Sequence, residues 1–293
     1  MSSSTFAAVA TAAAALAALL AGCGGPDGPG GDTPLKSFST TGEAPGLADR
    51  IETGPPRRYD APRMPEPPVL DGRLDEAGWI AAPWTEDFGD IRGPSLPAPR
   101  FRTRAKIAWD ETHLYVAAEL EEPHVWAAMT EHDEIIWHEK NFEVFVDPDG
   151  DEELYFEYEI NALGTVFDLV LVRTYIAGGP ALHEWDWKGA RFGIHVDGTL
   201  NDPSDTDRGW TVELALPWTP MAPGLGEGGR IPPEPGDTWR INFSRVMWEH
   251  DVVDGRYVRR DPPEDNWTWS PQGLINMHLP RFWGFVTFRD APR

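Results

Sequence analysis

The sequence predicts an all-β fold, a β-sandwich of the jelly-roll or immunoglobulin-like kind with short helical turns. Three observations support this: short segments alternate apolar and polar residues, turns rich in the 29 glycines and 29 prolines separate them, and few segments have helical periodicity. Many short strands with almost no helix are typical of a sandwich. One sandwich often reaches roughly 200–250 residues, so the 293-residue chain does not require two domains.

The alternation is clearest in two neighbouring segments, 142–147 and 153–161. In the second, Leu154, Phe156, Tyr158 and Ile160 alternate with polar residues, which is the period of a strand with one buried face. Further strands are predicted at residues 106–109, 113–120, 165–173, 191–196, 209–216, 238–248 and 283–289. The helical candidates are short, at residues 75–82 and 217–221.

The charge excludes two classes of partner. The chain has 48 Asp and Glu against 25 Lys and Arg, a formal net charge of −23. A nucleic-acid binder needs a basic surface to neutralise phosphates, and anionic lipid head groups also attract basic residues. The 14 tryptophans exceed what a single sandwich core requires and therefore suggest aromatic binding surfaces.

Residues 1–22 are typical of a signal peptide. Phe6–Gly22 has no charge, is too short for a membrane span, and ends in small residues. The tetrapeptide Leu20-Ala21-Gly22-Cys23 resembles a bacterial lipobox, which predicts cleavage before Cys23 and lipidation of its thiol. The first five residues lack the basic charge of such signals, so a secretory peptide with an incidental cysteine is the alternative.

The mature chain is predicted to have two parts. Residues 23–58 are rich in Gly, Pro, Ser and Thr and are interpreted as a flexible tether. Residues 59–293 would form the sandwich. We therefore expect a lipid-anchored protein of the cell envelope, at the outer membrane and facing either the periplasm or the surface, with no other contact with the membrane.

One face of the predicted sheet is polar. Glu143, Glu157 and Glu159 point away from the apolar side of two adjacent strands, and Asn242 does so on a later strand. Tryptophans flank these strands at positions 137, 248, 267 and 269. Carboxylates and amides bind sugar hydroxyls, and aromatic rings stack on the apolar face of a pyranose. The alternative is an ordinary solvated outer face.

The segment Val69-Leu70-Asp71-Gly72-Arg73-Leu74-Asp75-Glu76-Ala77-Gly78-Trp79 resembles the opening signature of family 9 carbohydrate-binding modules. Three further blocks match in order, at residues 108–116, 141–147 and 282–286, so that the resemblance spans about residues 67–288. It implies a β-sandwich, calcium in structural sites, and a sugar held between two tryptophans. Such modules are usually appended to xylanases, so we expect this chain to be a free-standing, tethered relative.

The resemblance also implies site residues. The first stacking tryptophan matches Trp137, the strand carboxylate matches Glu143, and the later asparagine matches Asn242. A family arginine falls at Glu159, which reverses its charge, and the second tryptophan falls near Met277 or His278. Trp267 or Trp269 would replace that missing second stacking tryptophan. The expected carbohydrate-binding residues are therefore Trp137, Glu143, Glu159, Asn242, Trp267, Trp269 and His278.

An acidic loop is the candidate calcium site. Asp147, Asp149 and Asp151 supply the hard oxygen ligands that calcium prefers, but glycine stands at the fourth position, which does not fit an EF-hand loop. A simple type I turn is the alternative.

Three other functions remain open. Glu143, Glu157 and Glu159 offer the paired carboxylates of a glycosidase, but the chain has no other catalytic motif and we expect no enzymatic activity. A haem-binding electron-transfer module would use methionines and histidines among residues 129, 132, 138, 247 and 250. A structural lipoprotein would bind a protein through its tryptophans. The main expectation is a polysaccharide or oligosaccharide ligand in carbohydrate catabolism, with a glycoside hydrolase or transport partner.

Overall fold

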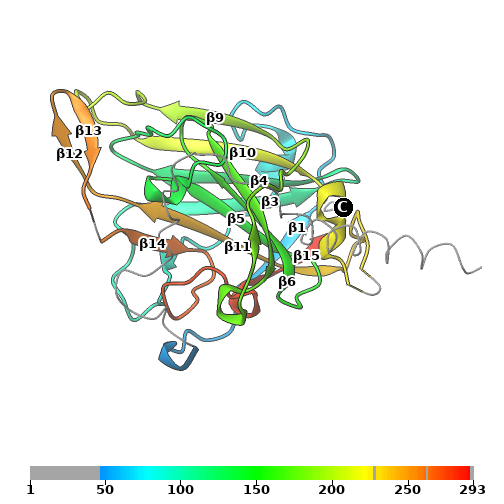
Figure 1. Ribbon diagram of the computed structural model, residues 1–293. Helices are drawn as coiled ribbons and strands as arrows, with labels where there is room; N and C mark the ends of the chain where they lie inside the picture. Colours follow the sequence, from blue (N-terminus) through cyan, green and yellow to red (C-terminus); the bar gives the residue numbers. More distant parts are fainter. Residues whose placement is uncertain (1–46, 227–228, 262, 291–293) are drawn as a thin grey trace, which may run out of the picture. The chain divides into compact units, whose positions relative to one another are not determined.

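The computed structural model describes residues 47–226, 229–261 and 263–290. The predicted signal peptide, Cys23 and residues 24–46 of the predicted tether lie outside the described residues. Figure 1 shows two β-sheets packed face to face, and the described helices are short. The prediction of an all-β sandwich with short helical turns is confirmed.

The larger sheet contains nine strands within the described residues, in the order β1-β15-β11-β5-β6-β7-β8, with β14 paired to β11 and β2 paired to β14. Its pairs are antiparallel except for β1 with β15. The strands are β1 (Arg58–Pro62), β2 (Gly89–Asp90), β5 (Phe142–Asp147), β6 (Glu153–Ile160), β7 (Val166–Arg173), β8 (Ala181–Leu182), β11 (Thr238–Met247), β14 (Asp265–Thr268) and β15 (Gly284–Arg289).

The smaller sheet has the order β3-β4-β10-β9 and is antiparallel. Its strands are β3 (Thr103–Trp109), β4 (His113–Glu121), β9 (Arg191–Asp197) and β10 (Gly209–Pro217). A hairpin of β12 (His250–Val253) and β13 (Arg256–Arg259) follows β11 and projects at one end of the sheets (Figure 1).

The helical elements are α2 (Ala77–Ala81) and the 3₁₀ turns η1 (Leu47–Asp49), η2 (Ile136–His138), η3 (Tyr175–Ala177), η4 (Thr219–Gly224) and η5 (Pro280–Phe282). Among the described residues, no helix has the length and apolar character needed to cross a bilayer. Residues 50–57, assigned to the tether by the sequence, contact the domain: Arg50 Nε donates to the Gln272 carbonyl at 2.6 Å, and the Arg57 carbonyl accepts from Phe285 N at 2.8 Å.

Among the described residues, three apolar clusters hold the domain together, one between the sheets and one on the outer face of each sheet. They explain the tryptophan content differently from the sequence interpretation, because most of these rings pack inside the protein. The buried tryptophans are Trp79, Trp109, Trp126, Trp187, Trp210, Trp218, Trp239, Trp248, Trp267, Trp269 and Trp283. Three packed layers need more large side chains than one sandwich core.

The segment that carries the opening signature packs on the outer face of the smaller sheet. Glu213 on β10 is fully buried there and accepts hydrogen bonds from Asp71 N (3.1 Å), Gly72 N (2.7 Å) and Trp79 Nε1 (2.7 Å). Burial raises the pKa of Glu213 to about 7. The signature therefore fixes a structural contact at a distance from the polar face of the larger sheet.

Candidate functional site

Three glutamates lie side by side on the outer face of the larger sheet. Glu143 on β5 is paired in register with Glu159 on β6, and Glu157 stands two residues before Glu159 on the same face. The sequence predicted this common face correctly, but the face is neither open nor solvated. Glu143, Glu157 and Glu159 are 4%, 4% and 2% exposed. We call these three residues the glutamate cluster.

Distant segments bury the cluster. An apolar group from β5, β6, β7 and three loop segments covers this side of the sheet, namely Ile91, Ile136, Phe145, Tyr155, Phe167, Leu169, Leu171, Met277 and Trp283. The segments around Ile91 and Met277 are remote from the cluster in sequence, whereas Ile136 precedes Glu143 by seven residues. Strand alternation reports which way a side chain points but not what covers it, which is why the sequence left a solvated face open.

The cluster contains little that neutralises its charge. Asn141 Nδ2 donates to Glu143 Oε1 at 2.9 Å and to Glu159 Oε2 at 3.0 Å. The carboxyl groups of Glu157 and Glu159 face each other and can share a hydrogen bond when one of them is protonated. No Lys, Arg or His nitrogen among the described residues forms an ion pair with these carboxylates within 4.0 Å. Burial raises the pKa of Glu143 to about 7 and that of Glu157 to about 8, and raises the pKa of Glu159 well above its usual range.

Glu157 is the member of the cluster with the fewest hydrogen-bond partners. Within the described part of the chain, only the Glu159 carboxyl group hydrogen-bonds to its side chain. Some buried side-chain atoms of the described residues have no hydrogen-bond partner, but none of them is an oxygen of the glutamate cluster. The side chain of Glu157 can therefore accept further hydrogen bonds.

Trp137 lies on η2, which contacts β6. It is half-buried, and its carbonyl accepts a hydrogen bond from Trp248 Nε1 at 2.9 Å. Buried Glu139 fixes the same loop, accepting from Ala128 N at 2.8 Å and from Asn161 Nδ2 at 2.6 Å. Trp137 is thus held beside the strand that carries Glu157 and Glu159.

Asn242, Trp267 and Trp269 have other surroundings. The Asn242 amide is fully buried and pairs with the Ser270 backbone, donating to the carbonyl and accepting from the amide nitrogen, both at 2.9 Å. Trp267 and Trp269 lie in the core between the sheets, 3% and 0% exposed. In this structure neither ring offers a face to a ligand.

His278 is half-buried and lies against Phe145 and Tyr155, which are on the same two strands as the glutamate cluster. It contacts Tyr155 across a 3.4 Å hydrogen bond between the phenol and Nδ1, and its ring lies edge-on to Tyr175, with 4.6 Å between centroids. Burial lowers the pKa of His278 to about 3, so its imidazole is neutral near pH 7.

Tyr175 is an aromatic residue that the sequence analysis missed. It lies on η3 just after β7, and the residue is 42% exposed. Burial and then the charges of Glu157 and Glu159 raise its pKa, which places the phenol within electrostatic range of the cluster. Tyr175 follows the predicted strand in an irregular turn, so no periodicity marked it as part of this face.

The predicted calcium loop does bring its carboxylates together. One oxygen from each of Asp147, Asp149 and Asp151 lies within 4.8 Å of the others. Asp147 is buried and accepts hydrogen bonds from Gly150 N (2.9 Å) and Glu152 N (3.1 Å). The oxygen donor set fits calcium, and the loop also closes its own turn through these bonds.

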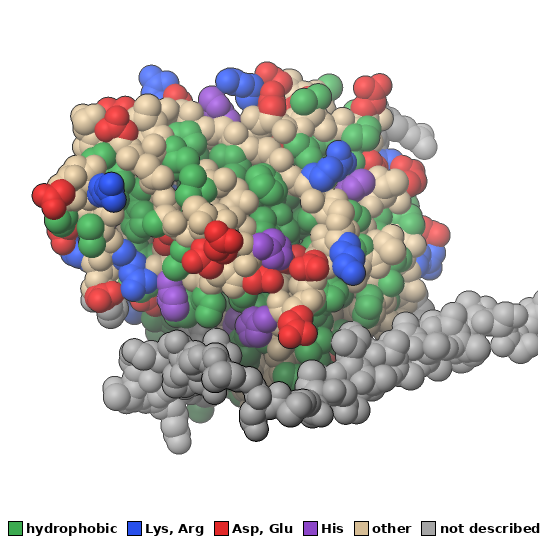
Figure 2. All heavy atoms as spheres, turned by 45° about the horizontal axis from the view of Figure 1, so that its top comes forward, with side chains coloured by type: hydrophobic (Ala, Val, Ile, Leu, Met, Phe, Trp, Pro, Cys, Tyr) green, Lys and Arg blue, Asp and Glu red, His purple; other side chains and the backbone are tan. Residues whose placement is uncertain are grey.

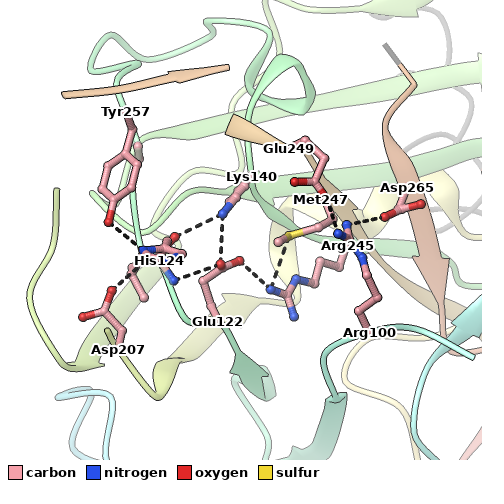
Figure 3. Close-up of polar contacts among 12 residues, drawn as sticks. Arg100, Glu122, His124, Lys140, Asp207, Arg245, Met247, Glu249, Tyr257 and Asp265 are labelled. Carbon is pink, nitrogen blue, oxygen red and sulfur yellow. Dashed lines mark hydrogen bonds and ion pairs between the residues drawn. The ribbon is translucent and has the colours of Figure 1, made fainter. Parts of the chain in front are cut away.

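A buried ion cluster lies on the face of β11 that points away from the glutamate cluster. Its side chains are drawn in Figure 3. Glu122 accepts hydrogen bonds from Lys140 Nζ at 2.9 Å and from Arg245 Nη2 at 2.8 Å, and all three residues are buried. The sulfur of Met247, a residue of the haem alternative, lies 3.6 Å from Arg245 Nη2. In this cluster the carboxylate is paired with two cations, unlike the carboxyl groups of the glutamate cluster.

Comparison with known proteins identifies the family. Residues 70–231 match the family model described as "carbohydrate family 9 binding domain-like", which is more than half of the chain. The chain belongs to this family. The resemblance found in the sequence is confirmed, and the family 9 match includes Trp137, Tyr175 and the whole glutamate cluster.

Solved structures show the same fold at low sequence identity. A family 9 carbohydrate-binding module from Caldicellulosiruptor kristjanssonii in complex with cellotriose has a TM-score of 0.50 and 16% identity, covering 80% of this chain and 95% of its own. A candidate carbohydrate-binding protein from Bacteroides uniformis has a TM-score of 0.56 and 17% identity, covering 79% and 99%. No curated protein matches this family 9 chain in sequence.

Proposed function

We propose that this chain is a glycan-binding domain without catalytic activity, which holds a saccharide against the glutamate cluster. The observation that carries the proposal is the set of three adjacent buried carboxylates without a cation partner. Such groups are costly to bury unless hydrogen-bond donors satisfy them. The hydroxyl groups of a sugar are closely spaced, uncharged donors that suit this need, and their hydrogen bonds would favour the ionised form of carboxyl groups whose pKa values burial has raised.

Aromatic residues beside the cluster would supply the apolar contacts. Trp137 would stack on the sugar ring, as expected from the family resemblance. In this proposal Tyr175, which is exposed, is the second aromatic residue that stacks on the sugar. The neutral imidazole of His278, which contacts Tyr175, supplies a further polar contact. Because the carboxylates are only slightly exposed, sugar entry requires the side chains above them to move, and we propose that η3 moves.

The test is Trp137→Ala. Calorimetric titration with soluble xylan, glucan, mannan and pectin fragments should give saturable binding with one glycan class. We expect the variant to bind at least about 30-fold more weakly, equivalent to about 2 kcal/mol, because a stacked ring is lost. Its unfolding temperature should change little, since Trp137 is only half-buried.

Trp84→Ala is the matched control. Trp84 is also half-buried but lies on the smaller sheet, where Arg104 and Lys106 stack on its ring. We expect it to bind the glycan like the unmodified protein. If the Trp137→Ala variant binds the glycan as tightly as the unmodified protein does, Trp137 is not part of the site.

Glu157→Gln tests the absence of catalysis together with binding. The substitution keeps the shape but removes a group that can ionise, so above pH 8, where Glu157 is a charged acceptor, affinity should fall at least about 10-fold, which corresponds to 1.4 kcal/mol. Prolonged incubation of the unmodified protein with the bound glycan should release no new reducing ends. If the unmodified protein does release reducing ends and the Glu157→Gln variant does not, the protein is a glycosidase instead.

We also propose that Asp147, Asp149 and Asp151 hold a structural calcium ion. Calcium should raise the unfolding temperature of the protein, because an ion that binds only the folded state stabilises it. Asp149→Asn should lose this increase, and Asp205→Asn, in another exposed acidic turn, should keep it. Equal calcium-dependent increases in all three proteins would contradict the proposal.

The cellular setting is proposed from the sequence alone. Lipidation of Cys23 would hold the domain at the cell envelope, where it would present a polysaccharide to a glycoside hydrolase or a transporter. Cys23→Ala should move the protein from the membrane fraction to the soluble fraction of the cell. On the face in Figure 2, acidic, basic and histidine side chains are interspersed with apolar ones.

A further inference from the structure

A second group of side chains with metal-binding chemistry lies at the edge of the larger sheet. It consists of His132 in the loop before η2, Asp168 on β7 and Asp186 in the loop after β8. One ligand atom from each residue lies within 4.8 Å of the others. The three residues come from separate segments, so their spacing in the sequence gave no indication of a shared site.

Asp168 supplies an observation independent of this proximity. Its side chain is 3% exposed, and its Oδ2 accepts a hydrogen bond from Trp187 N. The other oxygen, Oδ1, is among the buried side-chain atoms with no hydrogen-bond partner in the described part of the chain. That oxygen is aimed at His132, whose Nε2 lies 3.4 Å away. Apart from the ion pair that a protonated His132 would form, no donor in the described part of the chain satisfies this buried oxygen, which leaves a place for a ligand.

The distances suit a metal ion between the two residues. Ligands bound to zinc at about 2.0–2.1 Å with tetrahedral angles lie about 3.4 Å apart, and the His132 Nε2–Asp168 Oδ1 distance is 3.4 Å. Asp186 is exposed and can approach as the third ligand. Three protein ligands leave one position for water.

The second nitrogen of His132 is also oriented. Its Nδ1 lies 3.1 Å from Asp133 Oδ1, so that a proton on Nδ1 leaves Nε2 free to bind the ion. A carboxylate on the far nitrogen is the usual arrangement for a histidine that binds a metal. His132 is 51% exposed and lines an open surface depression, which gives an ion a path to the site.

We propose that His132, Asp168 and Asp186 form a binding site for a divalent transition metal of the zinc type, with Asp133 as a positioning residue. The imidazole distinguishes it from the all-oxygen loop at Asp147, because imidazole favours zinc-type ions and carboxylates alone favour calcium. The residues of this site are different from those of the glutamate cluster, so the metal proposal can be tested independently of the glycan proposal.

The experiment is equilibrium dialysis of the protein, purified without a histidine tag, against zinc chloride in buffer containing excess calcium. Bound zinc is measured by elemental analysis, and cobalt is used in parallel because tetrahedral cobalt has intense visible absorption. We expect one strongly bound zinc ion per chain. Asp133→Asn should weaken zinc binding about 10- to 100-fold, as loss of an orienting carboxylate does. His132→Ala and Asp186→Asn should weaken it further.

Matched controls use exposed neighbours outside the group. His183→Ala and Glu184→Gln remove an exposed histidine and an exposed carboxylate from the same loop region as Asp186 and should bind zinc normally. The proposal is overturned if the unmodified protein binds no zinc, if calcium displaces it, or if the controls lose as much affinity as His132→Ala. Because His132 and Asp186 are exposed, their variants should fold normally, and unfolding temperatures without metal check this.

Discussion

At the scale of single residues, Glu122 carries the clearest electrostatic consequence. Its two carboxylate oxygens contact two different buried cations, Lys140 and Arg245. Replacing it by alanine leaves both cations without their partner in the interior. We therefore expect Glu122→Ala to lower the free energy of unfolding by about 3–5 kcal/mol, measured by urea denaturation.

The neighbouring residue provides the control. Glu121 is half-exposed and pairs with Arg102 at 3.3 Å on the surface. Exposed pairs contribute about 0–1 kcal/mol, so Glu121→Ala should shift the urea midpoint only slightly. A Glu122→Ala protein as stable as the Glu121→Ala protein would show that the buried ion cluster does not contribute as its geometry indicates.

The same scale shows what could be predicted from the sequence. Alternation along β5 and β6 placed Glu143 and Glu159 on one face, because side-chain direction in a strand depends only on local backbone geometry. The partner of Asn242 and the burial of Trp267 could not be predicted, since both depend on contacts between segments far apart in the chain. Tyr175 and the group around Asp168 were missed for that reason too.

At the scale of elements, Gly72 decides whether the signature segment can pack on the smaller sheet. Its φ is +79°, and an added Cβ would collide with the backbone nitrogen of His195 on β9. Neither the turn nor the strand can move freely, because Gly72 N also donates to buried Glu213. We expect Gly72→Ala to lower the free energy of unfolding by more than about 2 kcal/mol, measured by urea denaturation.

Gly54→Ala separates the collision from the backbone strain. Gly54 has nearly the same φ, +80°, but an added Cβ would have nothing within 4 Å. This variant should lose only the strain of the left-handed conformation, about 1–2 kcal/mol. Equal losses in the two variants would show that strain alone, and not the contact with β9, makes Gly72 necessary.

Elements differ in how far the sequence could predict them. Strands with long alternation, such as β6 and β10, were predicted within one or two residues of their observed bounds. β1 and β14 were missed, because each is short and is defined by pairing with a strand that is not its neighbour in the sequence: β1 with β15, and β14 with β11. The 3₁₀ turns η2 and η3, which carry Trp137 and Tyr175, also lacked a periodic signal.

At the scale of the whole molecule, buried acids should make stability increase as the pH falls. Glu143, Glu157 and Glu213 have pKa values of about 7, 8 and 7 in the folded protein, against an ordinary value of 4.5, mainly because burial disfavours their charged forms. Between pH 4.5 and 8 the folded state therefore binds more protons than the unfolded chain. The free energy of unfolding then falls as the pH rises through this window.

The expected measurement is an unfolding temperature that increases steadily from pH 8 to pH 5.5. Each fully titrating group contributes about 1.4 kcal/mol per pH unit. The net charge of −23 adds a general repulsion that protonation also relieves, so the two causes must be separated. Glu157→Gln removes one buried group and should flatten the pH dependence, whereas Glu184→Gln removes an exposed charge and should leave its slope unchanged. Equal slopes in both variants would attribute the effect to overall charge and not to the glutamate cluster.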